Sequence, residues 1–461
     1  MKQAKKEKFG GRLGFELDSE IDESLVTAHA GVPLALELFR SLGLAEVVES
    51  AVGSKERDRG LKTWELVESF WALWLAGGDR CEDFKMLRDD AALAELLGHG
   101  FPAPNTARDF LDGFDDPDLP LWRAGDRAAV RDESAGLVGL AAVNAALLCH
   151  LQRLHPSATA TLDIDATIIE SHKRSSQRTY DGRRGYQPVV GLWAEHDVVV
   201  LDEFRDGNVP AGCGNLRFLE RALSQLPAGI EQTYVRADSA LYEGEVLRYC
   251  EEHGIGYAIS ADLSPQLEAV IGSLPEEAWS FWDDESDAVR EWAEVNYVPD
   301  DGDWRKWRGG DRRYLAVRIV RRQRDFAGGE VVRHFAVVTN REGDGLDLLR
   351  WHRGKAGTVE HTHDVLKNEL SGSCLPSDRF GANAAWFRLN VLLYNLLSFF
   401  KRTALPGEFL RSRPKRLRFV VFNVVGKVVR HARERLLRLA SRAQLEIFAL
   451  ARGRVRAAAC S

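Results

Sequence analysis

Three short acidic stretches, far apart along the chain, constrain the fold more than any other feature. Residues 162–167 (Leu-Asp-Ile-Asp-Ala-Thr) and 235–239 (Val-Arg-Ala-Asp-Ser) each place an acid at the end of an apolar, β-branched run. Residues 357–360 (Gly-Thr-Val-Glu) place a third acid in an amphipathic, helix-like segment. Two strand-end aspartates and one distant helical glutamate are the residues that a two-metal site needs. Hard divalent cations take oxygen ligands of this kind.

Asp163 and Asp165 occupy alternate positions of the first run, so both side chains lie on one face of the predicted strand. An acid inside an apolar strand is costly to bury unless a metal or a charged partner accompanies it. Asp165, directly before Ala-Thr, is the first choice for a metal ligand. Asp163 is predicted to support it at the metal, or to be buried with a hydrogen-bond partner. The alternative is that these acids cap the turn after the strand.

Asp238 and Glu360 complete the predicted metal site. Asp238 precedes a serine and could simply be the N-cap of a helix, but a metal shared with Asp165 on an adjacent strand is favoured. Glu360 lies in a helical segment with a buried apolar stripe, and taken alone it would be a solvated acid. Lys367, seven residues further on, lies on nearly the same side of that helix.

Cations suited to phosphate contacts surround these acids. The predicted DNA-binding residues near them are Arg353, Lys355 and Lys367 around Glu360; Arg183 and Arg184 after the first acid; and Trp304, Arg305, Lys306 and Trp307. In the last group, aromatic rings could stack on unpaired bases; ordinary cross-strand pairing in a charged hairpin is the alternative. His361 and His363 point apart on a helix, so a zinc site is not expected, and no phosphate-binding glycine loop or His-Glu-x-x-His motif is present.

The periodicity of apolar residues predicts five regions. Residues 1–157 form an all-helical N-terminal domain; residues 158–261 form strands and helices of a mixed sheet; residues 262–345 are a β-rich insertion; residues 346–402 are helices that return to the sheet; and residues 403–461 are a basic helical region. A single helix is expected over residues 346–370, and one or two helices over residues 411–456.

The charge of the chain is unevenly distributed. The net charge is −7, yet residues 401–461 carry 16 Lys and Arg against 3 Asp and Glu, a local net charge of +13. Such asymmetry indicates a basic arm that meets phosphate; Arg416, Arg418, Arg433 and Arg435 are its predicted DNA contacts. The six cysteines form no Cys-x-x-Cys pair, and the apolar stretches 135–148 and 391–400 are too short for a membrane span. We therefore expect a cytoplasmic protein with free thiols and no membrane partner.

The ordered set of motifs resembles bacterial insertion-sequence transposases with a group 1 DDE domain. The resemblance rests on the three acidic stretches, on residues 355–361 (Lys-Ala-Gly-Thr-Val-Glu-His) with 366–370 (Leu-Lys-Asn-Glu-Leu), and on residues 379–386 and 393–397; it covers roughly residues 30–405. It implies an α/β, RNase H-like core, a mixed sheet flanked by helices with a β-rich insertion before the last acid. It also implies that Asp165, Asp238 and Glu360 are the three metal-binding acids and that Lys367 is the basic residue downstream.

The activity implied by the resemblance is cleavage of the ends of an insertion sequence and their transfer into target DNA. Two Mg²⁺ ions, for which Mn²⁺ can substitute, would serve a two-metal phosphoryl transfer. The partners would be double-stranded DNA, as terminal inverted repeats and as target, and a second copy of the chain, because two ends must be cut together. Two alternatives stay open: an RNase H-like nuclease without strand transfer, and a domesticated protein that only binds DNA.

Overall fold

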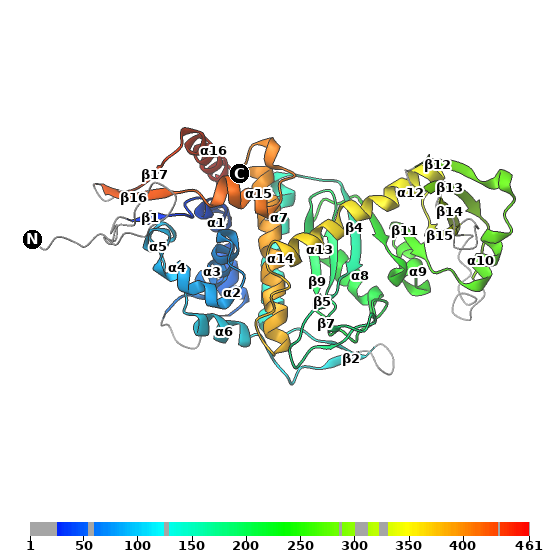
Figure 1. The fold of residues 1–461 in the computed structure, drawn as a ribbon, viewed down its shortest axis with the longest axis horizontal. Coiled ribbons are helices and arrows are strands. Elements are labelled where there is room, and N and C mark those ends of the chain that lie inside the picture. Colours follow the sequence, from blue (N-terminus) through cyan, green and yellow to red (C-terminus); the bar gives the residue numbers. More distant parts are fainter. Residues whose placement is uncertain are drawn as a thin grey trace, which may run out of the picture.

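In the computed structural model the chain is described over residues 25–53, 60–123, 129–284, 288–299, 312–321, 331–431 and 434–460. A mixed sheet forms its centre, and helices flank it (Figure 1). The central strands are β4 (Thr159–Ala166), β8 (Val189–Trp193), β9 (Val198–Glu203), β10 (Gln232–Ala237) and β11 (Gly256–Ala261). Their order is β11-β10-β4-β8-β9. The strands β4, β8 and β9 are antiparallel neighbours, whereas β10 runs parallel to both β4 and β11. A mixed sheet flanked by helices is the architecture that the sequence predicts.

Helices connect and cover these strands. The helices α8 (Asn215–Ser224) and α9 (Gly244–Glu252) link β9 to β10 and β10 to β11, and they pack on β9 and β11. Both lie in residues 158–261, where the sequence predicts strands and helices of a mixed sheet. A small separate sheet of β5 (Ile169–Glu170), β6 (Gln177–Arg178) and β7 (Arg184–Tyr186) follows β4.

Residues 262–345, predicted to be a β-rich insertion, contain four strands among their described residues, and these strands extend the main sheet. Its elements are α10 (Pro265–Gly272), β12 (Ser280–Asp284), β13 (Ala288–Val295), β14 (Arg313–Arg321) and β15 (Val331–Thr339). The last strand, β15, pairs antiparallel with β11, so the insertion lengthens the sheet to nine strands in the order β12-β13-β14-β15-β11-β10-β4-β8-β9. At the far end of the molecule in Figure 1, the insertion lies opposite the N-terminal helices.

The N-terminal region is helical, as predicted, apart from short strands. Its helices are α1 (Val32–Ser41), α2 (Leu44–Ala51), α3 (Thr63–Ala76), α4 (Phe84–Asp89), α5 (Ala91–Leu97), α6 (Pro104–Asp112) and α7 (Ala135–Leu154). A hairpin of β2 (Leu121–Arg123) and β3 (Ala129–Arg131) precedes α7. By length and composition α7 could cross a membrane, but it packs against α2 and β9 in the structure, so its apolar face belongs to the core.

The long helix α14 (Phe380–Thr403) joins the N-terminal helices to the sheet. It is buried over almost its whole length. Trp386 meets Trp74 of α3 edge to face at 4.9 Å between ring centroids, and the indole of Trp71 donates to the carbonyl of Leu389 at 3.0 Å. On its other side, the amide of Asn395 bonds the backbone of Val199 in β9. The two regions therefore share one hydrophobic core.

The prediction of a single helix over residues 346–370 is wrong. The structure has α12 (Gly345–Arg353), a 3₁₀ turn (Gly354–Gly357) and α13 (Val359–Asn368). Thr358 leaves the helical conformation, with φ −116° and ψ −86°. Two glycines within four residues weaken the helix here, and the Thr358 hydroxyl is used in a tertiary hydrogen bond described below. The break lets α13 begin one residue before Glu360.

The prediction of helices throughout residues 411–456 is also wrong. Only α15 (Pro414–Leu417), a π-helical turn (Arg418–Phe422) and α16 (Arg442–Cys460) are helical. Between them β16 (Gly426–His431) pairs with β17 (Glu434–Leu439) and with β1 (Val26–Thr27). In β16 the exposed Lys427 lies between the buried Gly426 and Val428, an alternation of period two. β-Branched valines favour a strand. The partner strand β1 lies some 400 positions away along the chain, so the local spacing of apolar residues wrongly indicated a helix.

Candidate active site

Asp165, near the end of β4, and Asp238, directly after β10, lie at the same edge of the sheet. In the parallel pairing of β4 with β10, Ile164 lies opposite Ala237, so the residues that follow each of them meet at the same edge of the sheet. Asp238 is also an N-cap: its carboxylate accepts a hydrogen bond of 3.0 Å from the Ala240 backbone N–H. The cap and the ligand interpretations are thus compatible, because the second carboxylate oxygen is not needed for the cap.

Asp163 lies deeper in β4 and is completely buried. Its two oxygens accept a bidentate pair of bonds from the Arg236 guanidinium at 2.6 and 2.7 Å, and one of them also accepts from the Thr358 hydroxyl. Arg236 in turn donates to the carbonyl of Trp351 at 2.7 Å. Of the two roles predicted for Asp163, this geometry favours the buried, hydrogen-bonded one. Arg236 was not singled out in the sequence, although an arginine inside an apolar strand needs such a partner.

Glu360 stands in the first turn of α13, exposed to solvent. Burial raises the pKa of Asp165 to about 6; the nearby Lys355 ammonium opposes that rise, and the carboxylates of Asp238 and Glu360 add to it. The three acids from β4, β10 and α13 are therefore near enough to repel one another. Lys355 is itself nearly buried, so it is placed to offset this negative charge and is not freely available to external DNA.

Lys367 also reaches the site. Its ammonium donates to the Thr167 hydroxyl at 2.9 Å, two residues beyond Asp165. Burial lowers the pKa of Lys367 below its usual value, while Asp364 and Asp165 favour the charged form. The seven-residue spacing from Glu360 thus does place a cation beside the acids.

Two buried histidines complete the surroundings of the acids. His363 has its Nε2 3.7 Å from an Asp165 oxygen, and burial lowers its pKa to about 3, so it is neutral near pH 7. His352 lies 3.0 Å from the Ala237 carbonyl, which requires its Nε2 to carry the proton as donor. Burial also lowers the pKa of His352, to about 4. The sequence offered only one signal for them, their spacing on the same helical segment as Glu360.

A cleft of about 470 Å³ opens beside Glu360. Its walls come from α12, from the turn before α13 and from the insertion, where Trp282 and Phe335 face it. Ser239, directly after Asp238, lines it as well. The cleft therefore gives a ligand access to Glu360 and to the residue that follows Asp238.

The other predicted DNA-binding residues do not form one patch. Arg353 is exposed near the cleft, 3.6 Å from Asp283. Arg183 pairs with Asp181 at 2.7 Å, and Arg184 donates to the Ser176 carbonyl at 2.7 Å. Trp304, Arg305, Lys306, Trp307 and Arg433 lie outside the described residues.

Three predicted contacts lie in the basic C-terminal region. Arg416 is exposed. Arg418 is largely buried and donates to the Trp74 carbonyl at 2.9 Å, which ties this region to α3. Arg435 lies 2.9 Å from Glu95 of α5. Only the side chain of Arg416 is thus fully presented to solvent without a fixed contact of this kind.

The acids fit a divalent cation in donor chemistry and in charge. All three candidates offer hard oxygen atoms. Burial is the main cause of the raised pKa of Asp165, and the Asp238 and Glu360 carboxylates add to it with negative charge that a cation would offset. Among the described residues, no three His, Cys, Asp or Glu side chains are gathered closely enough to form a finished metal cage. Because Glu360 is exposed on the first turn of α13, its side chain has room to turn toward the strand ends.

The sequence profile of the family described as transposase DDE domain group 1 matches residues 16–459. A fold with a mixed sheet and acids at its strand ends thus accompanies a match over nearly the whole chain. The protein belongs to this family of DDE transposases.

Comparison with individual proteins adds less. No curated protein sequence matches the chain. Among solved structures, the chain is similar to the piggyBac transposase in its synaptic complex with hairpin DNA. The two share 9% sequence identity with a TM-score of 0.41, over 84% of this chain and 79% of the other. The assignment to the family therefore rests on the sequence profile.

Proposed function

We propose that the chain is a DNA transposase that cleaves the ends of an insertion sequence and joins them to target DNA. The observation that carries the proposal is the convergence of Asp165, Asp238 and Glu360 from two strand ends and a helix, close enough to raise the pKa of Asp165. Family membership supports a nuclease and transferase activity on DNA. In this proposal the protein works in the bacterial cytoplasm on nucleoid DNA, as at least a homodimer.

The three acids would hold two Mg²⁺ ions, for which Mn²⁺ can substitute. When bound, such ions polarise the attacking hydroxyl or water and stabilise the leaving oxygen of an in-line displacement. The residues of the chain would position the DNA and offset negative charge. Lys355 and Lys367 balance the negative charge of acids and phosphate, since both lie near Asp165. The cleft beside Glu360 would admit the scissile strand.

The buried pair of Asp163 and Arg236 holds the elements that carry the three acids. It joins β4 to β10 directly, α12 through the Trp351 carbonyl, and the start of α13 through Thr358. These are the elements that carry or adjoin all three acids. Catalysis by positioning depends on such support, because little acid–base chemistry is asked of the protein in phosphoryl transfer.

The proposal is tested by giving the purified protein, with Mg²⁺, the DNA that flanks its own gene together with a target plasmid. Cuts at the element boundaries and joined products are expected. Cuts without joined products would instead indicate a nuclease, and tight binding with neither product would indicate a protein that only binds DNA. Repeating the reaction with Mn²⁺ tests the breadth of metal use.

A further inference from the structure

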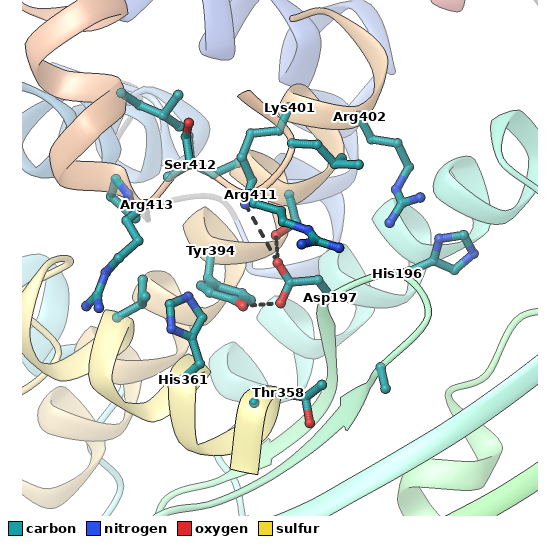
Figure 2. A pocket seen from close by; sticks show the side chains of 18 of the residues that line it. His196, Asp197, Thr358, His361, Tyr394, Lys401, Arg402, Arg411, Ser412 and Arg413 are labelled. Carbon is teal, nitrogen blue, oxygen red and sulfur yellow. Dashed lines mark hydrogen bonds and ion pairs between the residues drawn. The ribbon is translucent and has the colours of Figure 1, made fainter. Parts of the chain in front are cut away.

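A second, larger cavity lies behind the catalytic helix. It has a volume of about 710 Å³, and it is walled by the β8–β9 connection, the C-terminal half of α14 and residues 410–417 (Figure 2). His361 and Val365 of α13 face this cavity, whereas Glu360 faces the cleft described above. The cavity is therefore separate from the candidate active site, although one helix forms a wall of both.

The cavity holds more positive charge than its own acids balance. Asp197 accepts a hydrogen bond from the Tyr394 hydroxyl and lies 3.7 Å from the Lys401 ammonium. The Glu195 carboxylate is occupied by the backbone and hydroxyl of Thr161, at 2.8 and 2.7 Å. Both acids of the cavity wall thus have partners that do not include the arginines considered next.

Two arginines of the wall carry charge without a carboxylate partner. Arg402 donates at 3.1 Å to the Glu195 carbonyl, which is a neutral acceptor. Arg411 is exposed at the mouth of the cavity. Within the described part of the chain, no ion pair is formed by either residue. Figure 2 shows both guanidinium groups on the same side of the cavity as Asp197 and His196.

His196 adds no charge to this wall of the cavity. It is only 4% exposed and lines the cavity, yet among the described residues neither of its ring nitrogens has a hydrogen-bond partner. Burial, helped by Arg402, lowers its pKa to about 4, so the ring is neutral and can donate one hydrogen bond. Both ring nitrogens are also shielded from water, so the donors that this wall offers to a ligand are the guanidinium groups of Arg402 and Arg411.

We propose that this cavity binds a phosphodiester group of the DNA backbone, held by Arg402 and Arg411. The proposal rests on the proposed function, since DNA is the ligand. The volume exceeds what a single phosphate ion needs and has room for the attached sugar. Residues 401–461, with their net charge of +13, begin at this wall, so a DNA strand leaving the cavity would continue along a basic segment.

The bound strand would also contact the helix of the candidate active site. Thr358 lines the cavity, is the N-cap residue of α13 and bonds Asp163 through its hydroxyl. DNA in the cavity would therefore rest against the start of the helix that carries Glu360. The start of α13 would thus contact the DNA bound in the cavity and also carry Glu360 of the candidate active site.

The test compares the wild type with Arg411→Ala, Arg411→Lys and the control Lys85→Ala, which removes an exposed cation on α4, far from the cavity. A labelled duplex from the flanking DNA is titrated by fluorescence anisotropy at several salt concentrations. Arg411→Ala should weaken binding and lower the slope of log K against log[salt] by about 0.9, one phosphate contact. Arg411→Lys should restore the slope, and Lys85→Ala should leave it unchanged. Thermal melting confirms that each variant is folded.

Three outcomes would overturn the proposal, and they are distinguishable. A wild-type slope in Arg411→Ala would show that the cavity holds no DNA phosphate. Stabilisation of the wild type, but not of Arg411→Ala, by millimolar inorganic phosphate with an unchanged DNA slope would show that the site takes a free phosphate ion. Failure of the wild type to bind any duplex would overturn the proposed function together with the cavity's ligand.

Discussion

The buried ion pair between Asp163 and Arg236 holds together the elements that bear the candidate catalytic acids. Both oxygens of Asp163 are engaged by Arg236, at 2.6 and 2.7 Å, and the pair is almost completely shielded from water. Hydrogen bonds from this pair to the ends of α12 and α13 extend it beyond the two strands. The pair thus fixes the relative positions of β4, β10, α12 and α13 without being a candidate metal ligand itself.

Breaking this pair should destabilise the protein strongly. Asp163→Ala leaves the Arg236 charge buried without its partner, which typically costs about 3–5 kcal/mol. Urea unfolding of wild type and variant measures the loss. The matched control is Glu37→Ala, which breaks the exposed pair with Arg452 and should cost under about 1 kcal/mol. Equal, small effects of both substitutions would contradict the structural role of Asp163.

The raised pKa of Asp165 makes the metal-free protein sensitive to pH. Its folded-state pKa is about 6 against an ordinary 3.8, so the folded protein holds this proton more tightly than the unfolded chain. The ionised carboxylate therefore disfavours the fold: the cost grows as pH rises from about 4 to 6 and is complete above 6. Asp165→Asn should raise the melting temperature at pH 7.5 without metal and change it little at pH 4. A lower melting temperature of the variant at pH 7.5 would contradict this account.

Metal binding should stabilise the folded protein more as the pH rises and Asp165 loses its proton. Mg²⁺ or Mn²⁺ binds the ionised acids, and whatever binds only the folded state stabilises it. Addition of the metal should raise the melting temperature of the wild type at pH 7.5, raise it less at pH 5, and leave Asp165→Asn unchanged. A chelator should reverse the shift. An equal shift in Asp165→Asn would place the metal elsewhere.

Lys367 should contribute to the reaction more than to DNA binding. It lies beside Thr167 and Asp165, where it can balance charge on the phosphate. Lys367→Ala should reduce the cleavage rate by about 10²–10³-fold, the usual effect of removing one preorganised charge stabiliser. The exposed Lys415→Ala serves as the charge-matched control. A rate within a few-fold of the wild type would remove Lys367 from the reaction.

The basic C-terminal region should separate into DNA-contacting and structural arginines. Arg416→Ala removes an exposed cation, so it should lower the salt dependence of DNA binding and leave the melting temperature unchanged. Arg418→Ala removes a bond to the Trp74 carbonyl across to α3, so it should lower the melting temperature. Anisotropy titrations and thermal melts of both variants distinguish the roles. The reverse pattern would contradict the structural assignment of Arg418.

The sequence predicted the central sheet well because each strand is a short apolar run bounded by turn residues. The strands β8 and β15 lie in the regions predicted to be strand-forming, and the acids at the ends of β4 and β10 come to one edge of the sheet because the two strands are parallel. The lowered pKa values of His352 and His363 were not predicted. They depend on which elements cover each ring, and the sequence of the helical segment alone does not give these elements.

What escaped prediction depends on contacts between distant segments. The hairpin of β16 and β17 is completed by β1, and no local pattern at residues 426–439 names that partner. The insertion joins the main sheet through the pairing of β15 with β11. The sequence of either strand does not identify the strand with which it pairs. The break before α13 is stabilised by Thr358 bonding Asp163 in a strand almost 200 residues earlier.

The most direct test of the account is cleavage of the flanking DNA by the wild type, Asp238→Asn and Glu360→Gln in parallel with DNA binding. Each substitution keeps the size of the side chain and removes its charge. The account predicts that both variants bind the duplex with wild-type affinity and cut it at least about 10³-fold more slowly, because each removes a metal-binding oxygen anion. Cleavage at the wild-type rate by either variant would contradict the assignment of the active site to these acids.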